Sequence, residues 1–218
     1  MLNIAIDGPS GAGKSTIAKE IAKKLNIIYL DTGAMYRAIG LKAVRLGIDT
    51  NDEKGVTNIL DSTKIEIKYV DGVQIIYLDG ENVSTAIREH HISKAASNVS
   101  KIPAVRLKLV AMQREIAAKN NVVLDGRDIT SYVLKDANNK FYLTATPEER
   151  ANRRYKELIE KGQNVEYETI LADINDRDYN DTHRDFAPLT LTEDSVYIDS
   201  TNLTIEQAIE KILSYIKY

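Results

Sequence analysis

The sequence predicts an α/β fold in which helices wrap a parallel β-sheet. Short apolar runs of strand type are, for the most part, separated by segments of helical periodicity, which is the pattern of repeated strand–helix–strand units. A glycine-rich segment joins the first apolar run directly to an amphipathic helix. A short stretch of alternating residues interrupts this order and predicts an antiparallel insertion.

Five apolar runs are predicted as strands of the parallel sheet. They lie at residues 2–6, 27–30, 122–124, 141–143 and 196–198. Between residues 64 and 83 the pattern changes to two alternating runs around Asp71-Gly72, a dipeptide that favours a hairpin turn. We therefore expect a small antiparallel β insertion that forms an appended lobe and not an independent domain.

The predicted helices carry recognisable start signals and apolar stripes. The first helix has its stripe at Ile17, Ala18, Ile21, Ala22 and Leu25. Thr146-Pro147-Glu148-Glu149 and the pair Thr204 and Gln207 predict two capped helix starts. The last helix is expected to bury a stripe formed by Ile205, Ala208, Ile209, Ile212, Leu213 and Ile216.

Composition indicates an ordinary globular protein of 218 residues, with 43% hydrophobic and 28% charged residues. The net charge of −3 gives no basic field for nonspecific nucleic-acid binding. Cysteine is absent, so disulfides and thiolate zinc sites are excluded. We expect no basic leader, no membrane span and a cytoplasmic location.

The segment Gly8-Pro9-Ser10-Gly11-Ala12-Gly13-Lys14-Ser15 fits the pattern G-x-x-x-x-G-K-[ST] between a strand and a helix. Glycines let backbone N–H groups turn inward, and the helix N-terminus adds partial positive charge, so the loop can cradle phosphate. We predict ATP binding by residues 8–16, including Thr16, with Lys14 at the β and γ phosphates. A turn that merely joins strand to helix is the alternative, and the complete motif in this context disfavours it.

Magnesium is the predicted cofactor, because a cation that bridges two phosphates needs oxygen ligands. The Ser15 hydroxyl is the expected ligand from the loop. Asp7 and Asp125, each at the end of an apolar run, are further candidates for the same shell. Each can equally cap a neighbouring helix or turn, and both interpretations stay open.

The sequence contains neither the guanine-reading motif Asn-Lys-x-Asp nor the signature Leu-Ser-Gly-Gly-Gln. A GTPase switch and a transporter-type ATPase are therefore disfavoured. A small-molecule kinase needs, besides the loop, a second anion site and arginines that neutralise charge during transfer. Three further segments supply such residues: 31–37 (DTGAMYR), 125–128 (DGRD) and 177–184 (RDxxDxxR).

Together with the loop, the β insertion, residues 97–106, the helix 149–154 and the segment 187–189, these motifs resemble bacterial cytidylate kinase along nearly the whole chain. The resemblance implies a five-stranded parallel sheet of the P-loop kinase type. It implies one kinase domain, 1–218, with a monophosphate-binding lobe at about 35–105 and a lid at about 150–185. It further implies ATP-dependent phosphorylation of CMP and dCMP by a monomer.

The resemblance also assigns acceptor residues. Tyr36, Arg37 and Arg127 match the phosphate-binding positions, and guanidinium groups suit a dianionic phosphate. Ser97, Arg106 and Asp128 match the positions that read cytosine, and a carboxylate accepts from its amino group whereas uracil offers another acceptor. Arg177 and Asp181 match the sugar contacts, although their spacing also permits an intrahelical salt bridge. The full set of predicted CMP-binding residues is Thr32, Tyr36, Arg37, Ser97, Arg106, Arg127, Asp128, Arg177 and Asp181.

Arginines at 150, 153 and 154 form one basic helix face beside the segment Glu160-Lys161-Gly162, and this face predicts the lid. A solvated charged helix is the alternative. The residues expected to act in catalysis are Lys14, Arg127, Arg153, Arg154 and Arg184. The sequence departs from the family pattern at 129–131, where a glycine followed by threonine is usual, and at Asn180 and Thr182, where arginine is common.

Two other functions remain open: a kinase for a different monophosphate or small acceptor, and a nucleotide-binding module without turnover. His90, His91 and His183 lack ligand spacing and receive no role.

Overall fold

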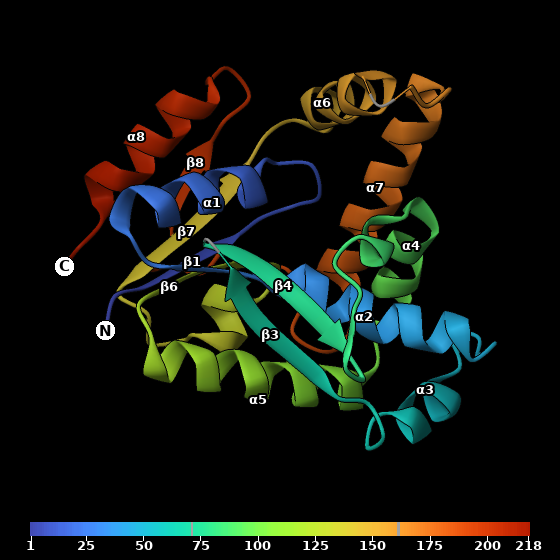
Figure 1. Ribbon diagram of the computed structural model, residues 1–218. Coiled ribbons are helices and arrows are strands. Elements are labelled where there is room, and N and C mark those ends of the chain that lie inside the picture. Colours follow the sequence, from blue (N-terminus) through green and yellow to red (C-terminus); the bar gives the residue numbers. More distant parts are fainter. Residues whose placement is uncertain (71, 161) are drawn as a thin grey trace. The chain divides into compact units, whose positions relative to one another are not determined.

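A computed structural model describes residues 1–70, 72–160 and 162–218. The chain divides into two compact units. The first unit comprises Met1–Ile27 and Asn121–Tyr218, and the second comprises Ile28–Asn120. Figure 1 labels most of their helices and strands.

The first unit is built from parallel strands and the helices that connect them. Its strands are β1 (Asn3–Asp7), β6 (Val122–Gly126), β7 (Asn139–Thr144) and β8 (Val196–Asp199). Its helices are α1 (Lys14–Leu25), α6 (Pro147–Glu160), α7 (Tyr167–His183) and α8 (Ile205–Tyr215), with a π-helical turn, η2 (Ile129–Val133). Figure 1 shows α8 alongside α1.

The main sheet confirms the predicted α/β class. Among the described residues it has five strands in the order β2-β6-β1-β7-β8, where β2 is Ile28–Asp31. Strand β1 pairs in parallel with β6 and β7, and β7 pairs in parallel with β8. Each of the five predicted apolar runs forms one of these strands.

The strand register places Asp7 and Asp125 at the carboxyl ends of neighbouring strands. Asp7, the last residue of β1, lies opposite Gly126 of β6, and Ile6 lies opposite Asp125. Parallel strands end at the same edge, so the glycine-rich loop after β1 and the residues after β6 emerge together. The core beneath them includes the fully buried residues Ile4, Ala5 and Ile6.

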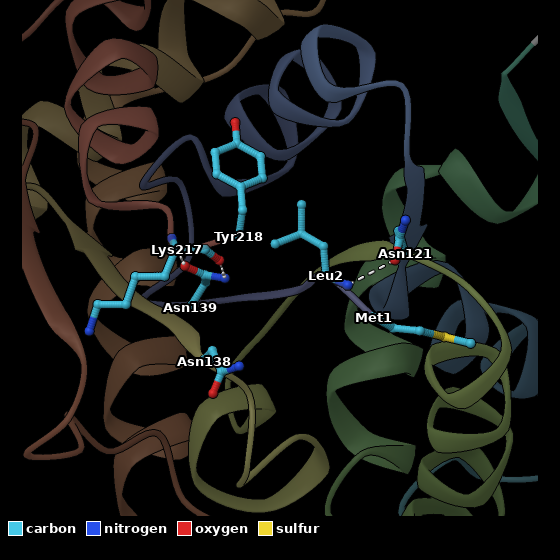
Figure 2. Close-up of a pocket in the computed structure, with 7 residues that line it drawn as sticks. All are labelled: Met1, Leu2, Asn121, Asn138, Asn139, Lys217 and Tyr218. Carbon is cyan, nitrogen blue, oxygen red and sulfur yellow. Dashed lines mark hydrogen bonds between the residues drawn. The ribbon is translucent and has the colours of Figure 1, made fainter.

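The opposite edge of the first unit carries a pocket that holds the chain ends (Figure 2). The amide of Asn139 pairs with the backbone of Lys217, accepting from its N–H at 2.7 Å and donating to its carbonyl at 2.9 Å. Asn121 accepts from the N–H of Leu2 at 2.8 Å. These bonds fix the chain ends at the amino-terminal side of β1, β6 and β7, away from the loop that follows β1.

Both predicted helix caps are confirmed, and one predicted core residue is wrong. Thr204 and Gln207 form a reciprocal capping box at α8, and the Thr146 hydroxyl accepts from the N–H of Glu149 at 3.3 Å. In α8 the buried stripe is narrower than predicted. Ile205, the first residue of the helix, is 49% exposed.

The second unit combines a small sheet with helices. Strands β3 (Ile65–Val70) and β4 (Val73–Leu78) form the predicted antiparallel hairpin, and β5 (Glu81–Asn82) pairs with β4. Of the predicted turn, Asp71 lies outside the described residues, and Gly72 has a φ of 75°. The helices are α2 (Thr32–Arg45), α3 (Glu53–Ile59), α4 (His90–Val99) and α5 (Pro103–Lys119), with a 3-10 turn, η1 (Ala86–Arg88).

Close packing of α2 on α4 depends on one glycine. A Cβ atom at Gly40 would lie 3.1 Å from the Cβ and carbonyl carbon of Ala95, tighter than ordinary contact. Glycine therefore lets the two helices approach. None of the helices in the described ranges is long and apolar enough to cross a membrane.

Candidate active site

The backbone of residues 8–16 follows the course that a phosphate-binding loop requires. Gly8 has a φ of 151°, and a Cβ atom there would lie 1.9 Å from the carbonyl oxygen of Leu143. Gly13 caps α1 in the left-handed conformation, with a φ of 87°. Only glycine adopts both conformations at low cost. The loop's glycines thus have a steric reason as well as a sequence pattern.

Lys14 is folded into this loop. Its side chain is buried, and Nζ donates to the carbonyl oxygens of Gly8 and Pro9, each at 2.7 Å. Burial, followed by the positive charge of Arg127, lowers the pKa of the Lys14 amine well below its usual value. The carboxylates of Asp125 and Asp181 oppose that shift. An added anion would favour the charged form of the amine.

Ser15 and Asp125 bring two oxygen donors together. The Ser15 hydroxyl donates to Oδ2 of Asp125 at 2.8 Å, and Asp125 is buried at the end of β6. No cluster of three or more acidic, histidine or cysteine side chains that could hold a metal occurs in the described part of the chain. Oxygen donors such as these two suit a hard cation.

Asp7 is engaged with backbone and hydroxyl donors. Its carboxylate accepts from the N–H groups of Ile129 and Thr130 at 2.9 and 2.7 Å, and from the Thr130 hydroxyl at 2.7 Å. Burial, with the nearby charge of Asp128, raises the pKa of Asp7 to about 6. Asp7 thus anchors the π turn after β6. The departure from the family pattern at 129–131 forms part of this contact.

Arg127 is paired with a predicted sugar-binding residue. Its Nε donates to Oδ2 of Asp181 on α7 at 2.6 Å. Burial raises the pKa of Asp181, but the charges of Arg127, Arg177 and Arg184 outweigh it and hold that pKa below its usual value. The ion pair between Arg127 and Asp181 therefore joins α7 to the segment after β6, in addition to any interaction of Asp181 within its own helix.

Arg184 lies next to the predicted cytosine reader. Its Nη2 is 3.4 Å from Oδ1 of Asp128, and both side chains are buried. The Arg184 Nε also donates to the carbonyl of Ala187 at 2.8 Å. Arg184 is thus placed to fix the Asp128 carboxylate.

The three arginines of the predicted lid helix have different surroundings. Arg150 is 3% exposed and bonded to the loop, so it does not belong to a solvated face. Arg153 donates to Glu149 and to the carbonyl of Ser200. Arg154 is more exposed and pairs with Glu157 at 2.8 Å. Lys161 of the adjoining turn lies outside the described residues.

On α7, the two departures from the family pattern bond to their own helix. Asn180 donates to the carbonyl of Asp176, and Thr182 donates to that of Asp178, both at 2.8 Å. These side chains supply hydrogen bonds but no positive charge.

The second unit holds its own group of predicted acceptor residues. Asp31 caps α2 by accepting from the N–H of Ala34, and its Oδ2 also accepts from Arg37 at 2.9 Å and from Arg88 at 2.8 Å. Burial raises the pKa of Asp31, but the two arginines outweigh it and lower that pKa. The sequence analysis missed Arg88, which lies 57 positions from Asp31.

The remaining acceptor residues of this unit lie on α2, α4 and α5. Arg106 is 1% exposed, and its guanidinium carbon lies 5.8 Å from the centre of the Tyr36 ring, within the range of a cation–π contact. Thr32 is buried at the start of α2, and Ser97 is half-buried on α4. The structure thus groups the predicted residues into two sets, one within each unit.

The comparisons with known proteins agree with the family resemblance seen in the sequence. A model of the family described as cytidylate kinase matches residues 4–218. The chain belongs to the cytidylate kinase family. A cytidylate kinase from Caldicellulosiruptor saccharolyticus is 55% identical over 97% of this chain and 94% of its own length. One from Clostridioides difficile is 53% identical over 99% of this chain and 98% of its own.

Solved structures support the fold alone. An uncharacterized protein from Eubacterium ventriosum matches with a TM-score of 0.57 at 15% identity, covering 99% of this chain and 98% of its own. A gluconokinase from Sinorhizobium meliloti matches with a TM-score of 0.50 at 13% identity, covering 99% and 91%. The cytidylate kinase family therefore carries a fold that these distant proteins share.

Proposed function

We propose that this chain transfers the γ-phosphoryl group of ATP to CMP and dCMP, giving ADP with CDP or dCDP. The observation that carries the proposal is the loop at 8–16, with Lys14 buried inside it and Ser15 beside Asp125. Membership of the cytidylate kinase family supports the choice of acceptor.

On the donor side, Lys14 neutralises phosphate charge. Its Nζ bonds to two backbone carbonyls, and a phosphate oxygen is a stronger acceptor because it is charged. We assign backbone N–H groups of residues 8–16 to the same phosphates. Phosphoryl transfer through a loose transition state needs little covalent chemistry from the protein, so charge neutralisation and positioning suffice.

Magnesium is part of this proposal. Hard oxygen donors suit it, and the Ser15 hydroxyl with the Asp125 carboxylate fits that requirement. Asp125 is preferred to Asp7, because the Asp7 oxygens already accept three hydrogen bonds. When bound, the ion would supply positive charge that offsets the negative charge of the nucleotide phosphates.

Cytosine selection is assigned to Asp128 and Arg106. The Asp128 carboxylate accepts from the cytosine amino group, and Arg184 keeps that carboxylate in place. Arg106 donates to acceptors of the ring. Uracil would present an oxygen to the Asp128 carboxylate, and two acceptors that face each other disfavour binding.

The acceptor's phosphate and sugar are assigned to arginines and their partners. Arg127 and Arg37 bind the phosphate as charged donors, each now paired with a carboxylate that an incoming anion can replace. Tyr36 adds a hydroxyl, and Arg177 with Asp181 binds the sugar. Arg153 and Arg154 on the lid helix approach the phosphates during transfer.

We further propose the single-domain division given by the resemblance, a lid at about 150–185, a monomer and a cytoplasmic location. ADP formation from ATP and magnesium tests the function, with CMP, dCMP, UMP, AMP and GMP offered separately. We expect selective turnover of CMP and dCMP, with kcat lowered about 10²–10³-fold in Lys14→Ala. Turnover of another monophosphate would leave the loop intact and reject the cytosine pocket, and no acceptor-dependent turnover would favour a binding module.

A further inference from the structure

One buried arginine of the first unit bonds to the phosphate loop without belonging to it. Arg150 of α6 is 3% exposed and donates in three directions. Its Nε donates to the carbonyl of Ala145 at 2.9 Å, and its Nη1 donates to the carbonyl of Ser10 at 2.9 Å. Its Nη2 lies 2.6 Å from Oδ2 of Asp178 on α7. Each of the three guanidinium nitrogens is thus in contact with a protein acceptor.

The bond to Ser10 has a consequence for the next residue. The described chain contains no cis peptide bond, so the carbonyl of Ser10 and the N–H of Gly11 point in opposite directions across one planar peptide. Because Arg150 holds the carbonyl on its own side, the Gly11 N–H must face the other way. Among the described residues that N–H donates to no protein acceptor.

The local packing is close enough to make this orientation depend on Arg150. A Cβ atom at Gly11 would lie 3.2 Å from Cβ of Arg150, so backbone and arginine stem are in contact. Gly11 has a φ of 75°, and glycine peptides rotate readily when nothing restrains them. A restraint on the Ser10 carbonyl therefore selects one orientation among several.

Asp178 holds the arginine from the other side. Its Oδ2 pairs with Arg150, and its Oδ1 is buried and accepts no hydrogen bond in the described ranges. A buried guanidinium needs such a partner, since an uncompensated buried charge is costly.

We propose that Arg150 is a positioning residue for the phosphoryl donor, which aims the Gly11 N–H into the loop by holding the Ser10 carbonyl, with Asp178 fixing Arg150. This inference rests on the proposed binding of ATP at residues 8–16. Arg150 touches neither nucleotide. Its effect on the donor passes through the Ser10–Gly11 peptide.

The test compares ATP and CMP affinities, measured separately by calorimetry on the full chain. In Arg150→Gln, the dissociation constant for ATP should rise about tenfold to a hundredfold, the size expected for one lost hydrogen bond to a charged group. The constant for CMP should stay within threefold of the original. Arg150→Lys keeps the charge but cannot serve three acceptors in a fork, and should weaken ATP binding at least threefold.

A matched control exists on β7 of the same unit. Lys140 is also buried and lies 2.6 Å from the carboxylate of Asp194, so its ammonium group is committed to a partner outside residues 8–16. Lys140→Gln should lower the melting temperature and leave ATP affinity within threefold. If Arg150→Gln fails to fold, Arg150→Lys decides the question.

ATP affinity within threefold of the original in both folded Arg150 variants, or in Arg150→Lys alone where only that one folds, would overturn the proposal. Equal losses for ATP and CMP would do the same, because they indicate a merely structural role. The proposed function can fail independently of this inference. If ATP binding depends on Arg150 but the chain does not phosphorylate CMP, the inference about Arg150 holds and the proposed function is wrong.

Discussion

Substituting Gly8 with alanine tests whether the loop's shape carries nucleotide binding. The new Cβ atom would lie 1.9 Å from the carbonyl oxygen of Leu143, at a φ of 151°. Overpacking of this kind costs about 1–3 kcal/mol and an unfavourable backbone about 1–2 kcal/mol, so the sum is about 2–5 kcal/mol. Since a domain is stable by about 5–15 kcal/mol, the variant should fold with a displaced loop.

The assay combines thermal unfolding with ATP titration. At about 2–4 °C per kcal/mol for a chain of this size, the melting temperature of Gly8→Ala should fall by about 4–20 °C. We expect ATP affinity to fall more than about tenfold, because several backbone donors shift together.

Gly47→Ala is the matched control. Gly47 also has a positive φ, 66°, but nothing lies within 4 Å of the position that its Cβ atom would take. Gly47→Ala should lose only the stability that an unfavourable backbone conformation costs, about 1 kcal/mol. The kinase activity of this variant should be unchanged. Gly8→Ala with the original ATP affinity and rate would refute the steric reasoning about the loop.

Three further predictions concern charged residues of the first unit. Lys14→Ala removes a charge that stabilises the transferring phosphoryl group, so it should lower kcat about 10²–10³-fold in the ADP-formation assay. The far-UV circular dichroism spectrum should stay unchanged. A rate within threefold of the original would contradict this role of Lys14. Asp128→Asn presents an amide that can donate a hydrogen bond to uracil. The kcat/KM for CMP should therefore fall about tenfold or more, and the kcat/KM for UMP should rise. An unchanged preference for CMP over UMP would show that Asp128 does not recognise the base. The pKa of Asp7 is raised from 3.8 to about 6, so the folded chain binds this proton more tightly than the unfolded chain, and the free energy of unfolding falls as pH rises from about 4 to about 6. The decrease in the free energy of unfolding amounts to about 3 kcal/mol. In Asp7→Asn, urea titrations between about pH 4 and about pH 6 should no longer show this decrease. If the variant and the original chain had the same pH dependence, Asp7 would titrate normally.

Features that are local in sequence were predictable. The strands followed from apolar runs bounded by turn residues, and the caps at Thr146 and Thr204 followed from side chains that reach an N–H three positions away. The loop at 8–16 was predictable because its glycines, lysine and serine are consecutive.

Features that depend on distant partners were not. Arg150 looked like one member of a basic helix face, and nothing local indicates that its fork reaches Ser10, 140 positions away. The same holds for Arg88, which meets Asp31 only through the fold of the second unit. Ile205 continued an apolar stripe in sequence, but the structure leaves it exposed at the helix start.

The metal predictions show a similar limit. Asp7 and Asp125 occupy equivalent strand ends in the sequence, and no local pattern distinguishes them. In the structure, Asp7 accepts bonds from residues 129 and 130, whereas Asp125 accepts from the Ser15 hydroxyl. The preference for Asp125 as a magnesium ligand therefore comes from three-dimensional contacts and stays a prediction.

The ratio of kcat/KM for CMP to that for UMP, measured with ATP and magnesium on the full chain, tests the central claim most directly. A donor–acceptor mismatch at a buried carboxylate predicts a ratio of about a hundred or more in favour of CMP. A ratio near one would contradict the assignment of Asp128 and Arg106 to cytosine, whatever the rate of phosphoryl transfer.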